Sequence, residues 1–276
     1  MNVALNIIKG LIVALADILP LSADGFKRIF GEASTYVHGT DKFMWFLFFS
    51  EIGIVAALLL KFRNEISDCF KALISAGQKI SRKEQPFREG KEKEILAYVR
   101  SSLPILLWYF IRISFWAIYR KPLTVVAAFT VSGIMLVIAD KVEKGELSLA
   151  DMKPSDGFLG GIFRTLGFIP GISGTGGMLL MSSLIGLSAD STCKYIFMLS
   201  IPIYIGKIFS GIGGLFSVSL NIVDAAGCVL SFVFALVSAY FMCDLLKRMY
   251  IKKNLRIFSV ILFILAAFML ILWMRG

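Results

Sequence analysis

Pro170-Gly171-Ile172-Ser173-Gly174-Thr175-Gly176-Gly177 lies inside an apolar segment that runs from residue 157 to residue 186. Five of these eight residues are glycine or proline, so we expect no helix to pass through the stretch unbroken. Backbone without helical hydrogen bonds is tolerated at membrane depth only where it lines a protein cavity. The stretch therefore predicts a polar site inside the bilayer, and its N–H groups suit an anion.

The composition indicates an integral membrane protein. Hydrophobic residues make up 57% of the 276 residues, which is more than a soluble domain of this length carries. Several apolar runs are long enough to cross about 30 Å of hydrocarbon as helices. We therefore predict an all-α fold in which residues 1–276 form a single membrane domain.

The net charge of +10 indicates membrane topology rather than nucleic-acid binding. Residues 61–100 hold ten Lys or Arg against six Asp or Glu, and residues 247–256 hold five basic residues and no acid. Basic residues beside spans mark the cytoplasmic side. We expect both segments to be cytoplasmic loops and expect no nucleic-acid partner.

Six apolar runs predict transmembrane helices, at residues 43–60, 102–118, 123–139, 195–213, 225–243 and 257–274. Two further regions, 2–40 and 157–186, are apolar but are interrupted by proline and glycine. Each is too interrupted for one span and too apolar for a loop in water.

Each span moves the chain to the other side of the membrane. Counted from the two cytoplasmic segments, both ends of region 2–40 lie outside the cell and both ends of region 157–186 lie inside it. Two re-entrant segments from opposite faces are typical of an inverted repeat with a binding site near the midplane. We therefore predict six transmembrane helices, two opposed re-entrant helical hairpins, and approximate repeat halves at 1–139 and 140–276.

A sequence echo between the two broken regions supports the repeat. Residues 10–22 read GLIVALADILPLS and residues 160–173 read GGIFRTLGFIPGIS. Each stretch is an apolar helix followed by a hydrophobic-proline step and a serine, with a glycine three residues further on, at Gly25 and Gly176.

Four segments carry a resemblance to a known family: residues 14–22, Glu51-Ile52-Gly53, residues 169–173, and Ser200-Ile201-Pro202. Through them nearly the whole chain resembles the bacterial undecaprenyl pyrophosphate phosphatases, the bacitracin-resistance family. The resemblance implies a six-span bundle with two opposed re-entrant hairpins, a multi-pass location in the bacterial inner membrane, and a polyprenyl phosphate or pyrophosphate ligand. It also implies Mg²⁺ or Ca²⁺ if the family's phosphatase activity is kept.

The first motif of that family reads approximately E-G-L-T-E-F-L-P-V-S-S-T-G-H. This chain keeps its second acid as Asp17 and also keeps Ser22 and Gly25, but Val13 takes the place of the first Glu and Phe26 that of the His. The second serine and the threonine are replaced by Ala23 and Asp24.

The second motif of the family reads approximately P-G-x-S-R-S-G. Ser173 matches its first serine, Gly174 stands at the arginine position, and Thr175 replaces the next serine. The glutamine that the family has upstream is Arg164 here.

These substitutions bear on catalysis, because cleaving a phosphoanhydride needs compensation of the phosphoryl charge and an acid, base or nucleophile beside it. We expect a protein that binds or translocates the lipid carrier with weak or no phosphatase activity. The alternative is a working diphosphatase with a rearranged site, in which Asp17 and Ser173 are catalytic. A transporter for another anion, or a non-catalytic partner of envelope enzymes, also stays open.

Five charged residues fall within apolar segments, namely Asp17, Glu51, Arg112, Arg164 and Lys207, and such charges are costly and usually functional. One reading is a phosphate cradle. It is built from Arg164, Lys207, Ser173, Thr175 and the N–H groups of Gly174, Gly176 and Gly177, with Asp17 and Glu51 balancing the charge. The other reading is a pair of structural ion pairs, Arg164–Asp17 and Lys207–Glu51, with no ligand.

The residues themselves indicate no metal site. The four cysteines lack CxxC spacing and His38 is the only histidine, so no zinc site or disulfide framework is expected. The sequence leaves the oligomeric state open, with a homodimer among the alternatives.

Overall fold

The computed structural model describes residues 3–30, 43–87, 90–111, 121–215 and 219–275. This part of the chain is helical and forms no β-strand. Its α-helices are α1 (Val3–Ile18), α2 (Ala23–Ile29), α3 (Phe43–Lys61), α4 (Arg63–Ser81), α5 (Gly90–Ile111), α7 (Pro122–Lys141), α8 (Pro154–Thr165), α9 (Gly174–Ile185), α10 (Ala189–Leu215), α11 (Ile222–Ile251) and α12 (Arg256–Arg275). Short 3₁₀ turns lie at Leu149–Asp151 and Leu166–Phe168.

Five described helices are long and apolar enough to cross a membrane: α3, α7, residues 189–212 of α10, α11 and α12. They cover five of the six predicted spans, which confirms the all-α integral membrane fold. The sixth predicted span, 102–118, begins within α5 and continues into residues outside the described part.

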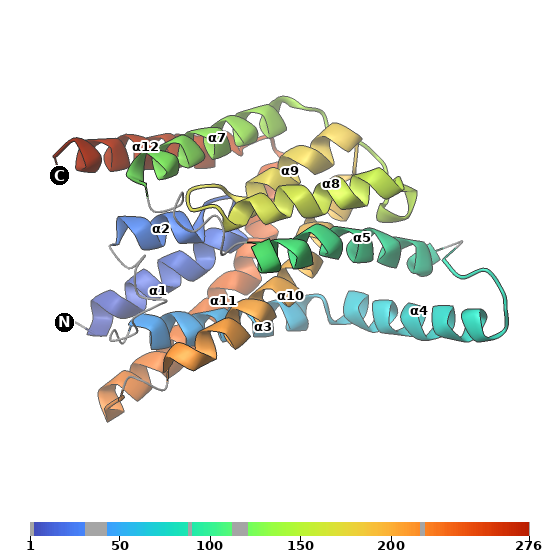
Figure 1. The fold of residues 1–276 in the computed structure, drawn as a ribbon, viewed down its shortest axis with the longest axis horizontal. Coiled ribbons are helices and arrows are strands. Elements are labelled where there is room, and N and C mark those ends of the chain that lie inside the picture. Colours follow the sequence, from blue (N-terminus) through green and yellow to red (C-terminus); the bar gives the residue numbers. More distant parts are fainter. Residues whose placement is uncertain (1–2, 31–42, 88–89, 112–120, 216–218, 276) are drawn as a thin grey trace.

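The two interrupted regions form helical hairpins that face each other. In Figure 1 the hairpin of α1 and α2 enters from the left, the hairpin of α8 and α9 enters from the right, and their turns lie near the middle of the bundle. The positions of the two turns follow from Pro20 and Pro170, neither of which lies in a helix.

Residues 61–100, predicted from their charges to be a cytoplasmic loop, are largely helical. They form α4 and the first half of α5, two helices that pack side by side beyond the ends of the other spans (Figure 1). The run of charges hid this hairpin, because α4 buries only small side chains, Ala72 and Ala76, against its partner. Likewise α11 continues to Ile251, so half of the predicted loop 247–256 is helical.

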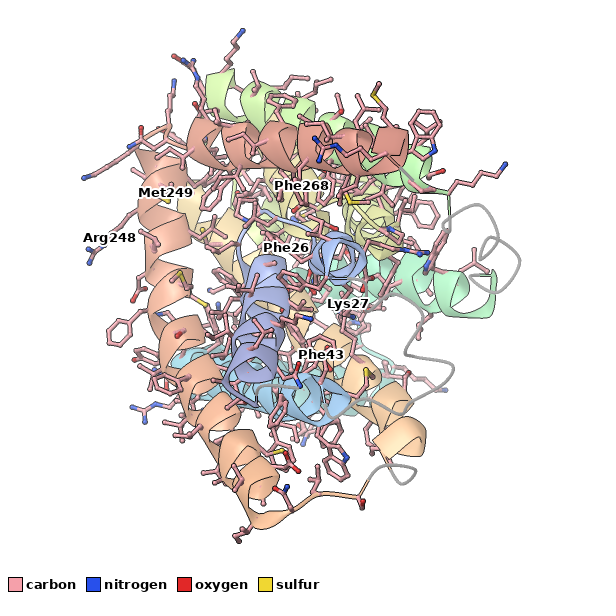
Figure 2. All side chains as sticks on the ribbon, turned by 90° about the vertical axis from the view of Figure 1, so that its left-hand side faces the viewer. Phe26, Lys27, Phe43, Arg248, Met249 and Phe268 are labelled. Carbon is pink, nitrogen blue, oxygen red and sulfur yellow. The ribbon has the colours of Figure 1, made fainter. Side chains whose placement is uncertain are left out.

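Helix packing encloses an apolar core that contains several buried polar and charged side chains. α3 packs on α11, α7 packs on α12, and α5 packs on α8. Figure 2 shows Phe26 and Lys27 of α2 in the middle of the bundle, whereas Arg248 of α11 points away from it. Lys27 is 4% exposed, and a buried lysine must be paired because its isolated charge is costly to desolvate. Charges inside this bundle therefore belong to a built network.

Candidate functional site

The two chain breaks have the same local structure. After Pro20, Ser22 is the N-cap of α2, and its hydroxyl accepts from the N–H of Gly25 at 3.2 Å. After Pro170, Ser173 is the N-cap of α9, and its hydroxyl accepts from the N–H of Gly176 at 2.9 Å. Proline ends each first helix and a serine cap starts each second one. The sequence echo thus corresponds to a shared capping geometry.

Hydrogen bonds join the two breaks to each other. The Ser22 hydroxyl also accepts from the N–H of Gly171 at 3.0 Å. The Thr175 hydroxyl donates to the backbone carbonyl of Asp17 at 2.6 Å. All four residues are buried, so these bonds form in a medium of low dielectric constant, where a lost partner is expensive. The turns are therefore fixed against each other in the interior of the bundle.

Ser132 on α7 is a further anchor that the sequence reading missed. Its hydroxyl donates to the carbonyl of Gly171 at 3.0 Å and accepts from the N–H of Ser173 at 2.9 Å. Ser132 is fully buried. The sequence feature that could have identified Ser132 is its position inside an apolar span, because a buried hydroxyl needs a hydrogen-bond partner.

Two glycines of the second break are required by their surroundings. Gly171 has φ +99°, which side chains disfavour, and a Cβ there would lie 2.8 Å from the carbonyl oxygen of Val125. A Cβ on Gly174 would lie 2.2 Å from an Nη atom of Arg164. The guanidinium of Arg164 thus occupies the space that a side chain at position 174 would need.

A three-residue ion cluster lies beside the two turns. The carboxylate of Asp17 lies 2.5 Å from Nζ of Lys207 and 3.5 Å from Nη1 of Arg164. Arg164 is 3% exposed and Asp17 is 7% exposed. Arg164 also donates to the Ser200 hydroxyl at 3.4 Å, while its Nε has no hydrogen-bond partner. α1, α8 and α10 therefore each bring one charge to the same point.

This geometry contains the predicted Arg164–Asp17 pair but not the predicted Lys207–Glu51 pair. Lys207 pairs with Asp17 and not with Glu51, so one carboxylate contacts both cations. The N–H groups of Gly176 and Gly177 donate to the side chain and carbonyl of Ser173. Because those two N–H groups complete the first turn of α9, they are not free to bind phosphate as predicted. Gly174 contributes room for Arg164.

Glu51 and Lys27 surround the cluster with further charge. Glu51 on α3 is 6% exposed, and within the described residues its carboxylate has no ion pair. Lys27 pairs with Asp24 at 2.9 Å. Arg112 lies outside the described residues. The three acids and three cations of this region balance, so an anion that enters must either displace a carboxylate or arrive with a cation.

The described residues contain no group of three or more His, Cys, Asp or Glu side chains that would hold a metal ion by themselves. Of the two buried carboxylates at this site, Asp17 contacts two cations, and Glu51 contacts none among the described residues. A Mg²⁺ or Ca²⁺ ion here would need oxygen ligands from the bound phosphate.

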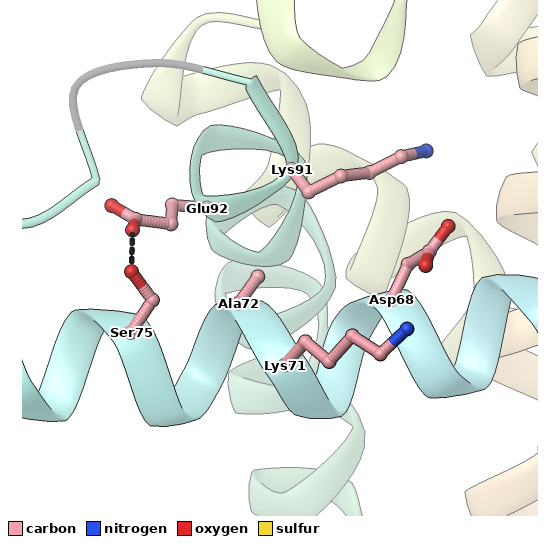
Figure 3. Close-up of a pocket in the computed structure, with 6 residues that line it drawn as sticks. All are labelled: Asp68, Lys71, Ala72, Ser75, Lys91 and Glu92. Atoms are coloured by element: carbon pink, nitrogen blue, oxygen red, sulfur yellow. Dashed lines mark hydrogen bonds between the residues drawn. The ribbon is translucent and has the colours of Figure 1, made fainter.

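An open pocket of about 460 Å³ lies away from this site, between α4 and α5 (Figure 3). Glu92 within it accepts from the Ser75 hydroxyl at 2.7 Å and from the N–H of Phe87 at 3.1 Å, and it pairs with Lys79 at 2.8 Å. Lys79 and then Ser75 lower the pKa of Glu92 to about 2. These groups satisfy one another's hydrogen bonds and charges. The contacts around the pocket therefore hold the hairpin of α4 and α5 together.

Comparisons with known proteins point to one family. The family described as "Bacitracin resistance protein BacA" matches residues 6–268. An undecaprenyl-diphosphatase of Thermosipho melanesiensis is 26% identical over 97% of this chain and 98% of its own length. One from Methanococcus maripaludis is 24% identical over 96% and 98%, and one from Pseudarthrobacter chlorophenolicus is 28% identical over 72% and 70%.

Proposed function

The chain belongs to the family of the bacitracin resistance protein BacA and is a multi-pass protein of the bacterial inner membrane, and we propose that it binds the diphosphate head group of a polyprenyl lipid carrier at the Asp17–Arg164–Lys207 cluster. The relatives are named for undecaprenyl diphosphate, which supplies the ligand class. We further propose that hydrolysis by this chain is slow and that binding or translocation of the carrier is its main role.

The observation that carries the binding proposal is the sharing of one carboxylate by two cations. Lys207 and Arg164 both contact Asp17, and Arg164 keeps an unused, buried Nε–H donor. An oxygen of a phosphate group carries charge and geometry similar to a carboxylate oxygen, and guanidinium binds both in forked pairs. A diphosphate therefore fits the place that Asp17 now occupies, once the Asp17 side chain turns away.

Access to the cluster favours entry along Lys207. The side chain of Lys207 is 20% exposed, compared with 3% for Arg164, and its ammonium lies 5.0 Å from the centre of the Tyr204 ring. The ligand first meets the lysine at the open edge and then reaches the arginine. When Asp17 is displaced, Lys207 turns toward the Glu51 carboxylate. Alternatively, a divalent ion would bind to that carboxylate.

The proposed slow hydrolysis rests on the hydrogen bonds that the Ser173 and Thr175 hydroxyl groups already form. The Ser173 hydroxyl caps α9, and the Thr175 hydroxyl donates to the Asp17 carbonyl. A serine nucleophile needs a base within hydrogen-bond reach, and the Asp17 carboxylate is held by two cations instead. A carboxylate stabilised in its charged form is a weak base.

Efficient diphosphatase activity is the second candidate. The similarity of this chain to proteins named undecaprenyl-diphosphatase covers 96–98% of both partners in two cases, which favours a shared reaction. In that case the site rearranges when the ligand binds, and Asp17 and Ser173 then carry the catalytic roles.

The test measures binding and phosphate release with the same purified protein in liposomes that contain undecaprenyl diphosphate, with Mg²⁺, with Ca²⁺ and with EDTA. We expect saturable binding and turnover far below the median enzyme rate of about 10 s⁻¹. Turnover near that rate, abolished in the Ser173→Asn variant, would establish the diphosphatase instead. Asparagine is an equally good helix N-cap without a hydroxyl, so this variant removes the nucleophile and keeps the fold.

A further inference from the structure

An exposed apolar stripe runs along α4, outside the membrane-spanning part of the molecule. Phe70, Leu73, Ile74 and Ile80 are 63%, 47%, 62% and 59% exposed. α4 also carries Arg63, Glu65, Asp68, Lys71 and Lys79, so lipid does not surround it as it surrounds a span. Contiguous apolar surface of this kind in water marks an interaction site.

The spacing of the stripe selects a helix as its partner. Phe70, Leu73, Gly77 and Ile80 follow one another at three, four and three residues, and the partly covered Ile66 precedes them by four. This is the alternation of a two-stranded coiled coil, in which each side chain inserts between four residues of the facing helix. Nothing lies within 4 Å of the space above Gly77, which leaves room for a neighbouring backbone.

The charges next to the stripe permit a partner with the same sequence. The flanking positions on one side are Cys69 and Ala76, and those on the other are Ser67, Ile74 and Ser81. These residues are uncharged, so from Ile66 to Ser81 two identical helices meet without like charges opposite each other. Arg63, seven residues before Phe70, lies on the same line at the start of α4. Coiled coils otherwise use charges at the flanking positions to exclude partners. Asp68 and Lys71 of α4 line the pocket next to α5 (Figure 3), and Lys79 pairs with Glu92 of α5.

The direction of α4 fits a second copy in the same membrane. Helical hydrogen bonds cross from α3 into α4 through Phe62, from its N–H to Leu58 and from Ile66 to its carbonyl, each at 2.9 Å. α4 therefore continues α3 away from the bundle (Figure 1) and does not turn along the membrane surface. Two copies with the same orientation in one membrane thus hold their α4 helices parallel, as a parallel coiled coil requires.

We propose that the α4 stripe of Phe70, Leu73, Gly77 and Ile80 pairs with the same stripe of a second copy of this chain. Large side chains bury about 150–200 Å² each when fully covered, so Phe70, Leu73 and Ile80, about half exposed, bury on the order of 300 Å² per copy. The pair stays below the roughly 1,200 Å² of a stable soluble complex. Confinement to one membrane raises the effective concentration of the two copies and compensates for the small buried area. The pairing therefore forms in the membrane and weakens in dilute detergent.

Cysteine cross-linking in membranes tests the pairing. In a variant without Cys69, Cys193, Cys228 and Cys243, Leu73→Cys or Ile80→Cys is introduced into the stripe, and Lys71→Cys, equally on α4 but off the stripe, is the matched control. Mild oxidation is expected to link two copies through residue 73 or 80 about tenfold more than through residue 71. Adding Phe70→Lys is expected to reduce the product by about tenfold or more.

Three results would overturn the proposal: equal linkage at all three positions, no linkage at either stripe position, or a product that contains another protein. Quenching of a tryptophan at position 70 by brominated lipids would also overturn it, because the stripe then lies on the membrane. A melting temperature in detergent equal to that of the unchanged protein shows that the bundle of each variant is folded. The proposal is independent of the ligand site.

Discussion

The break at Pro20 and the break at Pro170 are built alike and charged oppositely. Each ends an apolar helix and caps the next helix with a serine that accepts from the N–H of a glycine three residues on. The first break carries the anion Asp17 just before its proline, while the helix before the second carries the cation Arg164. A repeated backbone thus presents two different chemistries to the same point.

The side chains, rather than the backbone, distinguish the two breaks. The capping bonds fix the backbone at both, so the proposed ligand site depends on the side chains that each helix adds, together with Lys207 from α10. Variants that remove equivalent groups from the two breaks therefore separate the contribution of the scaffold from that of the charges.

Removing the cation of the second break has the largest expected effect. Arg164→Ala leaves Asp17 with one cation and opens a buried space. Loss of one member of a buried ion cluster costs about 3–5 kcal/mol, so we expect a large drop in melting temperature in detergent together with loss of carrier binding. Arg164→Lys, which keeps the charge, is the control and should recover much of the stability. Equal stability of Arg164→Ala and the unchanged protein would contradict the proposed network.

The residue after each capping serine gives a matched comparison. Ala23 follows Ser22 and carries a methyl group, whereas Gly174 follows Ser173 and has none because Arg164 lies there. Gly174→Ala should displace the guanidinium, cost about 1–3 kcal/mol and weaken carrier binding. Ala23→Gly should cost about 1 kcal/mol and leave binding intact. Thermal unfolding and binding assays on both variants check this, and equal binding by the two would refute the role of Gly174.

The capping serines are expected to differ as well. Ser22→Ala strands the N–H groups of Gly25 and Gly171, whereas Ser173→Ala strands that of Gly176. One buried donor without a partner costs about 1–3 kcal/mol, so Ser22→Ala should lower the melting temperature by clearly more than Ser173→Ala. The reverse order would show that the contact between the two breaks is unimportant.

The smallest expected effect lies outside the membrane, at Glu92. The Lys79 ammonium and the Ser75 hydroxyl hold the pKa of Glu92 at about 2, below its ordinary value of 4.5. The stabilisation is therefore fully present above pH 4.5 and is lost as pH falls toward 2. Melting curves between pH 6 and pH 3 should show a steeper loss for the unchanged protein than for Glu92→Gln. Parallel curves would contradict the Lys79–Glu92 pairing.

Much of the fold followed from residue patterns. Apolar runs of span length gave five helices, and Pro20 and Pro170 gave the two breaks, because hydrocarbon thickness and proline geometry act locally. The hairpin of α4 and α5 was missed because its contact uses alanines within a charged segment. The sequence also singled out Asp17, Arg164 and Lys207. It did not reveal that both cations contact Asp17, because that depends on how α8 and α10 cross α1.

Binding of farnesyl diphosphate to the Asp17→Asn variant, measured by calorimetry in detergent, tests the central claim most directly. If Asp17 occupies the place of the ligand's phosphate, the neutral amide competes less for Arg164 and Lys207. Binding should then tighten by about tenfold or more, while Lys207→Gln, the matched control, should weaken it. Unchanged or weaker binding by Asp17→Asn, with the variant folded, would contradict the account.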